Sequence, residues 1–78
     1  MLHENDVVRL KHSIAASSSS AWPGMPSTAL ATGTIGTVVM VHAANSLNSA
    51  YEVEFVDGAG HTLALLTLNE NDIELADS

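Results

Sequence analysis

The chain has 78 residues and no cysteine, and its nine acidic residues against two basic ones give a formal net charge of −7. That charge opposes the neutralisation of phosphates on which nucleic-acid binding depends, and it also repels an acidic membrane surface. Without cysteine, neither a disulfide nor a thiolate zinc site can stabilise so small a domain, which buries only about 60% of its unfolded surface, so oligomerisation is the most available source of further buried apolar area.

The N-terminal segment, residues 1–6, contains acidic residues and no apolar run, unlike a secretory signal peptide. No window of the sequence approaches the roughly 18 apolar residues of a membrane span. We therefore expect residues 1–78 to form a single soluble, cytoplasmic domain whose partners include neither nucleic acid nor a membrane.

The first predicted strand is Asp6–Lys11, which is β-branched at its centre, with Val8 and Leu10 on the face opposite Val7 and Arg9. Residues 12–32 then change to Ser, Ala, Pro and Gly, with four consecutive serines and both prolines of the chain. This stretch has neither helical nor strand periodicity, so it predicts a long loop after the first strand.

The second and third strands carry the clearest pattern. Thr37–His42 is rich in β-branched residues, which predicts a second strand that is apolar on both faces. Polar residues connect it to Tyr51–Val56, where aromatic and valine side chains alternate with Glu52 and Glu54. We interpret the glutamate side of this third strand as a solvated face.

The C-terminal part predicts a hairpin and a short last strand. Asp57–Gly60 supplies residues that tolerate positive φ in a turn, and the chain returns as a fourth strand over His61–Leu68. After a tight turn at Asn69–Asn71, the fifth strand is Asp72–Leu75. This order predicts an all-β fold, namely a small, strongly bent, five-stranded antiparallel barrel of the SH3-like type.

The segments GTVVMV, AYEVEFVD and TLALLTL, in this order and spacing, resemble a family of short uncharacterised bacterial proteins, a domain of unknown function expected to be an SH3-like barrel. The resemblance covers Asn5 to Leu75, and AYEVEFVD followed by ALLTL is its most specific part. The chain departs from the family pattern between Lys11 and Gly33, where its Ser/Ala-rich loop is longer. Small proteins of this kind are also similar to products of mobile, integron-type gene cassettes. The resemblance implies a fold and no catalytic residues.

The register of the third and fourth strands decides which leucines share the face of the glutamates. With a two- or four-residue loop, Glu54 lies opposite Leu63 and Glu52 opposite Leu65. With a three-residue loop Asp57 faces His61 and the parity flips. The residues on the glutamate side are then Ala64, Leu66 and Leu68. In either register we expect at least two leucines to point out of the barrel.

Two interpretations of these outward leucines stay open. Either Leu68 turns inward at the strand end or the long loop covers this face, or the face is an interface between copies of the chain. Desolvating a leucine contributes roughly 1.5–3 kcal/mol, so two leucines on each partner offset much of the entropy lost on pairing. Val38 and Met40, which a regular strand places on one apolar face, favour the interface. We therefore expect a homo-oligomer with the interface residues Val38, Met40, Leu63, Leu65, Leu66 and Leu68.

The chain's four histidines raise the question of a metal site. His42 ends the second strand and His61 begins the fourth, which places them roughly 20 Å apart at ~3.3 Å per residue. Glu52 and Glu54 lack the pocket that acid–base chemistry needs. The serines form no nucleophile elbow, and the glycines before the second strand lack the lysine and helix of a phosphate loop. We expect no metal, no cofactor and no catalytic residue, and hence a protein that is not an enzyme.

Trp22, with Pro23 and Met25, lies on the long loop, where SH3-type domains often receive a peptide. Alternatively Trp22 folds onto the barrel and closes the core of a chain with one Trp, one Tyr and one Phe. We predict a non-enzymatic, self-associating protein-interaction module whose acidic surface favours a basic protein partner, as in an antitoxin or immunity factor. The alternative is a small-ligand-binding or accessory subunit of an enzyme, with histidines or Trp22 lining a cleft between subunits.

Overall fold

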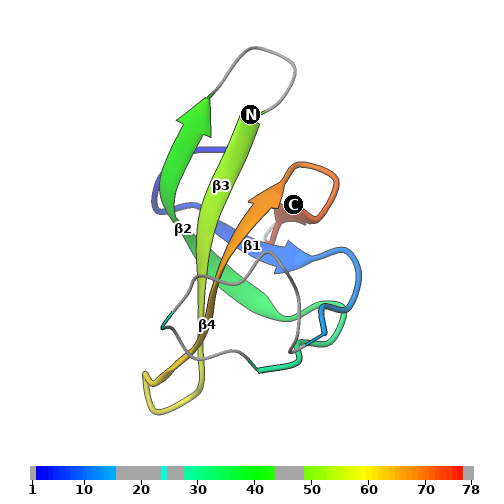
Figure 1. The fold of residues 1–78 in the computed structure, drawn as a ribbon, viewed down its shortest axis with the longest axis vertical. Coiled ribbons are helices and arrows are strands. Elements are labelled where there is room, and N and C mark those ends of the chain that lie inside the picture. Colours follow the sequence, from blue (N-terminus) through cyan, green and yellow to red (C-terminus); the bar gives the residue numbers. More distant parts are fainter. Residues whose placement is uncertain (1, 16–23, 25–27, 44–48, 77–78) are drawn as a thin grey trace.

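The structure is a computed structural model that describes residues 2–15, 24, 28–43 and 49–76. These ranges contain no helix, and therefore none with the length and apolar character needed to cross a membrane. Their strands, drawn in Figure 1, are β1 (Val7–Leu10), β2 (Ile35–Ala43), β3 (Ser49–Val56), β4 (Thr62–Asn69) and β5 (Ile73–Leu75).

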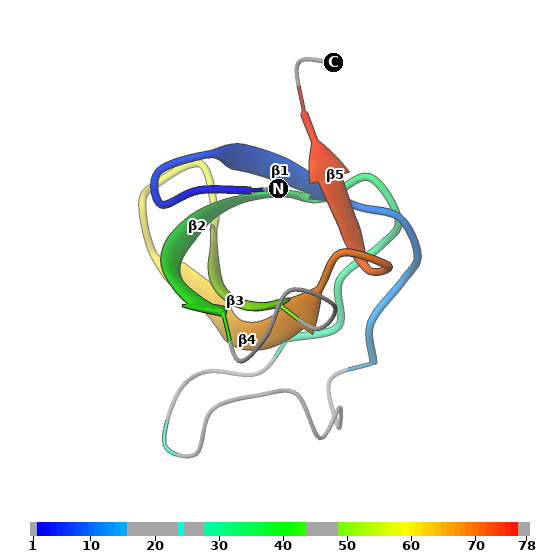
Figure 2. The ribbon, with the colours of Figure 1, turned by 90° about the horizontal axis from the view of Figure 1, so that it is seen from above.

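The five strands form one antiparallel sheet in the order β4-β3-β2-β1-β5. The sheet bends so strongly that β1 and β5 lie across the interior from β3 and β4 (Figure 2). β1 pairs with β2 along one edge and with β5 along the other, which brings the C-terminal strand back to the first one. The predicted five-stranded, antiparallel SH3-like barrel is confirmed.

The alternating side chains predicted for β1 and β3 are also confirmed. Val8 and Leu10 are buried on the inner side of β1, and Val7 is exposed on the other side. On β3 the inward side chains, Tyr51 among them, are fully buried. The apolar core inside the barrel consists of Leu2, Val8, Leu10, Ile14, Leu30, Val38, Tyr51, Val53, Phe55, Ala64, Leu66, Leu68 and Ile73.

The two ends of the long loop are attached to this core. Ile14 and Leu30 are buried and form an isolated antiparallel bridge, with N···O distances of 2.8 Å in both directions. The predicted partner-binding residues Trp22, Pro23 and Met25 lie outside the described residues. Both interpretations of Trp22 therefore stay predictions.

Gly36 allows β2 and β3 to pack closely inside the barrel. A Cβ atom at this position would lie 2.7 Å from Cε1 of Phe55 and 2.9 Å from Cγ1 of Val53. Both of those side chains are fully buried. The glycine is therefore required by packing against β3, since a strand glycine often marks a close approach of this kind.

A β-bulge in β2 contradicts the shared face predicted for Val38 and Met40. Val38 pairs with the inward Val53 and is fully buried, whereas Met40 pairs with Glu52 and is 47% exposed. The register shifts between them, so Val39 is an extra residue on this strand. Because a bulge inserts one residue, it reverses the alternation of side chains beyond it, and Val38 and Met40 point to opposite faces.

The β3–β4 hairpin differs from both predicted registers. Its turn has three residues, because the backbone N of Asp57 donates a hydrogen bond of 2.9 Å to the carbonyl of His61. A register shift then follows between Phe55 and Val56. Beyond it Glu54 lies opposite Leu65, and Glu52 lies opposite Thr67. The bulge thus reverses the parity that the turn alone would impose.

This register corrects the predicted interface. Leu66 and Leu68 belong to the core, 2% and 3% exposed, because they alternate inward along β4, and Val38 joins them there. Leu63 is partly buried against the same core. On β4 Leu65 lies opposite Glu54 on the side of the glutamates, and Leu63 lies at the register shift. Leu66 and Leu68 are therefore not outward leucines, contrary to the second predicted register.

Candidate functional site

The outside of the barrel carries rows of side chains that run across neighbouring strands. One row begins on β1 and crosses four strands through Val7, Thr37, Glu54 and Leu65. The adjacent row on β2, β3 and β4 consists of Met40, Glu52 and Thr67. A third row consists of His42, Ala50 and Asn69. We call the surface formed by these three rows the outer face.

Most of the exposed large apolar side chains lie on the outward surfaces of β1, β2 and β3. Five of the six such residues in the described part of the chain come from β1, β2 and β3, and each is between 43% and 48% exposed. We call this set the apolar patch, and its members are Val7, Ile35, Val39, Met40 and Val56. Met40 is the one member that the sequence predicted as an interface residue. Val7 was within reach of sequence reasoning, because it alternates with Val8 and Leu10 on β1.

Glu52 lies in the middle row of the outer face and is 3% exposed, so the interpretation of its side as solvated is wrong at this position. Thr67 Oγ1 donates a hydrogen bond of 2.6 Å to Glu52 Oε1. Nε2 of His42 lies 3.6 Å from the same oxygen. Oε2 of Glu52 is buried and has no hydrogen-bond partner in the described structure.

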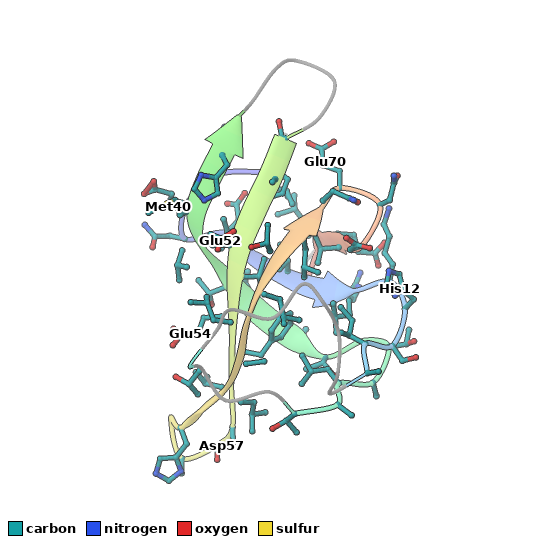
Figure 3. All side chains as sticks on the ribbon, in the orientation of Figure 1. His12, Met40, Glu52, Glu54, Asp57 and Glu70 are labelled. Carbon is teal, nitrogen blue, oxygen red and sulfur yellow. The ribbon has the colours of Figure 1, made fainter. Side chains whose placement is uncertain are left out.

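Glu54 occupies the next row along β3 and is half-buried. Its Oε2 accepts a hydrogen bond of 2.9 Å from Thr62 Oγ1. Met40, Glu52 and Glu54 lie along the same side of β3 in Figure 3. The outer face therefore combines two carboxylates with exposed apolar neighbours.

Neither carboxylate is neutralised by the chain's own lysine or arginine. Nε of Arg9 donates to Glu74 at 2.7 Å, and its Nη1 donates to the carbonyl of Ala76 at 2.6 Å. Nζ of Lys11 donates to the carbonyl of Glu70 at 3.3 Å. Arg9 and Lys11 are the only lysine and arginine residues of the sequence. Their hydrogen bonds join β1 to β5, to the residue after it and to the β4–β5 turn.

The histidines are dispersed over separate parts of the fold. His12 Nε2 lies 2.7 Å from Asp72 Oδ1, and the Ser13 carbonyl and the Asp72 carboxylate together raise the pKa of His12. His61 lies beside Asp57 in the β3–β4 turn, far along the hairpin from His42, which pairs with Ala50. The described residues include no group of three His, Cys, Asp or Glu that could hold a metal ion.

Tyr51 closes one end of the barrel through a contact that the sequence pattern does not predict. Its hydroxyl donates a hydrogen bond of 2.6 Å to Oε1 of Glu70 and accepts one of 3.4 Å from the backbone N of Leu2. Burial is the main cause that raises the pKa of Tyr51, with the Glu70 hydrogen bond second. The contact ties β3 to the β4–β5 turn and to the N-terminal segment, so we interpret it as structural.

Comparison with known proteins gives one match. The model of a family described as a domain of unknown function (DUF4926) matches residues 4–75, a range that includes all five strands. No curated protein and no solved structure matches the chain. The match agrees with the uncharacterised domain family that the sequence motifs resemble, and it assigns no activity to any residue.

Proposed function

The chain belongs to the DUF4926 family, a domain of unknown function, and we propose that it is a non-enzymatic protein-interaction module that associates with itself through the outer face of the barrel. The observation that supports this proposal is the apolar patch, five large side chains that are each nearly half-exposed on the outward surfaces of three adjacent strands. Exposed apolar side chains gathered in this way commonly mark a protein–protein contact, whereas scattered ones need no explanation. The absence of cysteine agrees with a cytoplasmic location, which we include in the proposal.

The energetics of the apolar patch permit a weak dimer. Covering the exposed half of one such side chain contributes about 1 kcal/mol, so ten of them in a symmetric pair contribute about 10 kcal/mol. Association costs about 4–15 kcal/mol of translational, rotational and side-chain freedom. The free energy gained by covering the patch is similar to the free energy lost on association. We therefore expect a symmetric dimer, in which both copies use the same surface, that forms only at high protein concentration.

Charge acts against the same contact. Each chain carries a net charge of −7, and Glu54 lies in the row of Val7, beside the apolar patch. Two copies that meet through this side bring like charges together, and salt screens that repulsion. We therefore expect self-association to become stronger as the ionic strength rises.

A basic protein, of the kind that an antitoxin or immunity factor binds, is the second partner in this proposal. Two features support it, namely the acidic net charge and the two outer-face carboxylates that lack a lysine or arginine partner. Resemblance to small bacterial gene-cassette products fits an accessory role of this type. These features define the partner by its chemistry, as a protein with a basic surface.

The proposal is tested by the mass of the protein in solution, measured by sedimentation equilibrium over a range of concentrations. We expect the wild type to exceed the mass of one chain at high concentration, and Ile35→Glu and Val56→Glu to remain monomeric. Leu75→Glu is the matched control, because it replaces an exposed apolar residue outside the apolar patch and adds the same charge. A folded wild type that stays monomeric throughout would contradict self-association.

A further inference from the structure

Glu52 is the single buried charged residue in the part of the chain that the structure describes. Buried carboxylates in folded proteins are usually paired with a cation or fully hydrogen-bonded, because an unsatisfied charge in a poorly solvated site is costly. Here Oε1 has Thr67 as a donor, whereas Oε2 has none. Local conflicts of this kind concentrate at functional sites, so this oxygen is a candidate for contact with another molecule.

Neither of the chain's two Lys/Arg side chains binds this oxygen. Arg9 is engaged by Glu74 and Ala76, and Lys11 by the carbonyl of Glu70. His42 is nearest to the other oxygen, Oε1, at 3.6 Å, which is too long for a hydrogen bond. A second copy brings the same engaged arginine and lysine, so an arginine or lysine for this oxygen has to come from a different protein.

The surroundings of Glu52 fit a long side chain with a charged end. Met40 lies directly opposite on β2 and is 47% exposed, and the His42 side chain on the same strand is 49% exposed. About half of each side chain is exposed to solvent and can contact a partner. A methionine side chain also adapts readily to a new neighbour. Glu54 lies two residues along β3 on the same face, about 7 Å from Glu52 by the rise of a strand. Leu65, opposite Glu54, adds a further apolar contact beside it.

We propose that Glu52, with Glu54 beside it, is the docking site for an arginine side chain of a basic protein partner. Oε2 of Glu52 is shielded from solvent in the unbound chain, so binding requires the Glu52 side chain to turn outward. The guanidinium then donates to Oε2 and to the Glu54 carboxylate, and its methylene stem packs on Met40 and Leu65. Arginine fits better than lysine, because its planar group offers five donors, is less strongly hydrated and can serve two carboxylates at once. The inference rests on the interaction-module part of the proposed function and is independent of self-association.

The test titrates the protein with a hexa-arginine peptide and follows binding by isothermal calorimetry. It uses protein concentrations below those that support self-association, since Met40 belongs to both contacts. We expect Glu52→Gln, which retains the acceptor for Thr67 but removes the charge, to weaken binding by at least about tenfold. Glu4→Gln is the matched control, because Glu4 is exposed and its loss changes the net charge equally. Equal weakening by both variants would overturn the site.

A second measurement does not depend on the folding of a variant. In the wild type, the peptide should shift the NMR signals of the Met40 methyl group and of the Glu52 carboxyl carbon more than those of other residues. Shifts confined to other regions would overturn the site. Hexa-lysine should bind more weakly than hexa-arginine, and spermidine should not displace the peptide. Two results would show that the site binds a small cation instead of a protein, and either would overturn the proposal. One is displacement of the peptide by spermidine, and the other is a shift of the Met40 and Glu52 signals by a divalent cation such as Mg²⁺.

The outcomes separate this inference from the proposed self-association. A wild type that is monomeric but binds hexa-arginine through Glu52 supports the docking site and removes the dimer. A wild type that dimerises and shows no Glu52-dependent binding supports the dimer and removes the docking site. The two contacts also differ in their response to salt, because screening weakens an arginine–carboxylate contact and strengthens the association of two acidic chains.

Discussion

Glu52 and Met40 lie directly opposite each other on β3 and β2, yet the glutamate is 3% exposed and the methionine is 47% exposed. The usual preference of a folded protein is the reverse, since carboxylates favour water and thioethers favour the interior. The pair is therefore a place where the fold gives up stability. Conflicts of this kind are expected at functional sites, which agrees with the arginine site proposed above.

Replacing Glu52 by methionine should stabilise the protein. The substitution removes a buried carboxylate with an unsatisfied oxygen and keeps a similar side-chain volume. Replacement of buried charges by apolar residues is often neutral or stabilising by about 1–4 kcal/mol, and we expect a gain in this range in the free energy of unfolding. Urea denaturation followed by circular dichroism measures it, and the variant should at the same time lose hexa-arginine binding.

Thr67→Val provides the control for this interpretation. In the wild type it removes the donor to Oε1 and should destabilise the protein by about 1–3 kcal/mol, because a buried acceptor is left unsatisfied. In the Glu52→Met background the same change should cost less than it does in the wild type. If the two substitutions change the free energy of unfolding additively, the Glu52–Thr67 hydrogen bond does not account for the contribution of Thr67 to stability.

Gly36→Ala should destabilise the barrel. The new Cβ would lie 2.7 Å from the Phe55 ring, and β2 and β3 would have to separate in the middle of the core. Overpacking of this kind typically costs about 1–3 kcal/mol in the free energy of unfolding. Gly58→Ala is the control, because no heavy atom lies within 4 Å of its Cβ position and its φ is not positive. The thermal midpoint should fall for Gly36→Ala and remain close to the wild type for Gly58→Ala.

The contact between His12 and Asp72 should make stability depend on pH. The pKa of His12 is raised above 6.5 in the folded state, by the Ser13 carbonyl first and then by Asp72. Its contribution is therefore fully present below an unfolded-state pKa near 6.5 and is lost as the pH rises through the higher folded-state pKa. We expect the thermal midpoint of the wild type to exceed that of His12→Gln most clearly at acidic pH. A difference that grows toward alkaline pH would contradict this assignment.

Opposite salt responses provide a test without any substitution. Raising the ionic strength from about 0.01 M to 0.5 M shortens the screening length from about 30 Å to below 10 Å. We expect the dissociation constant for self-association to fall over this range and that for hexa-arginine to rise. Sedimentation and calorimetry in the same buffers measure both, and a common direction would mean that one of the two contacts has been misassigned.

The sequence by itself determined the five strands, their order along the chain and the inward face of β3. Each of these is a local property: β-branched runs, turn residues and a strict alternation from Tyr51 to Phe55 need no knowledge of distant neighbours. The acidic balance that favours a basic partner is likewise a property of composition. For these reasons the barrel could be predicted before its coordinates were known.

Only the tertiary structure decided which residues make up the outer face. The bulges at Val39 and in the β3–β4 hairpin each add one residue. The first separates Val38 from Met40, and the second places Leu65, instead of Leu66 and Leu68, on the side of the glutamates. A bulge depends on how a strand pairs with its neighbour, and the alternation of side chains within either strand does not mark where it falls. The burial of Glu52 has the same origin, because the side chains beside a residue in a sheet come from strands distant in sequence.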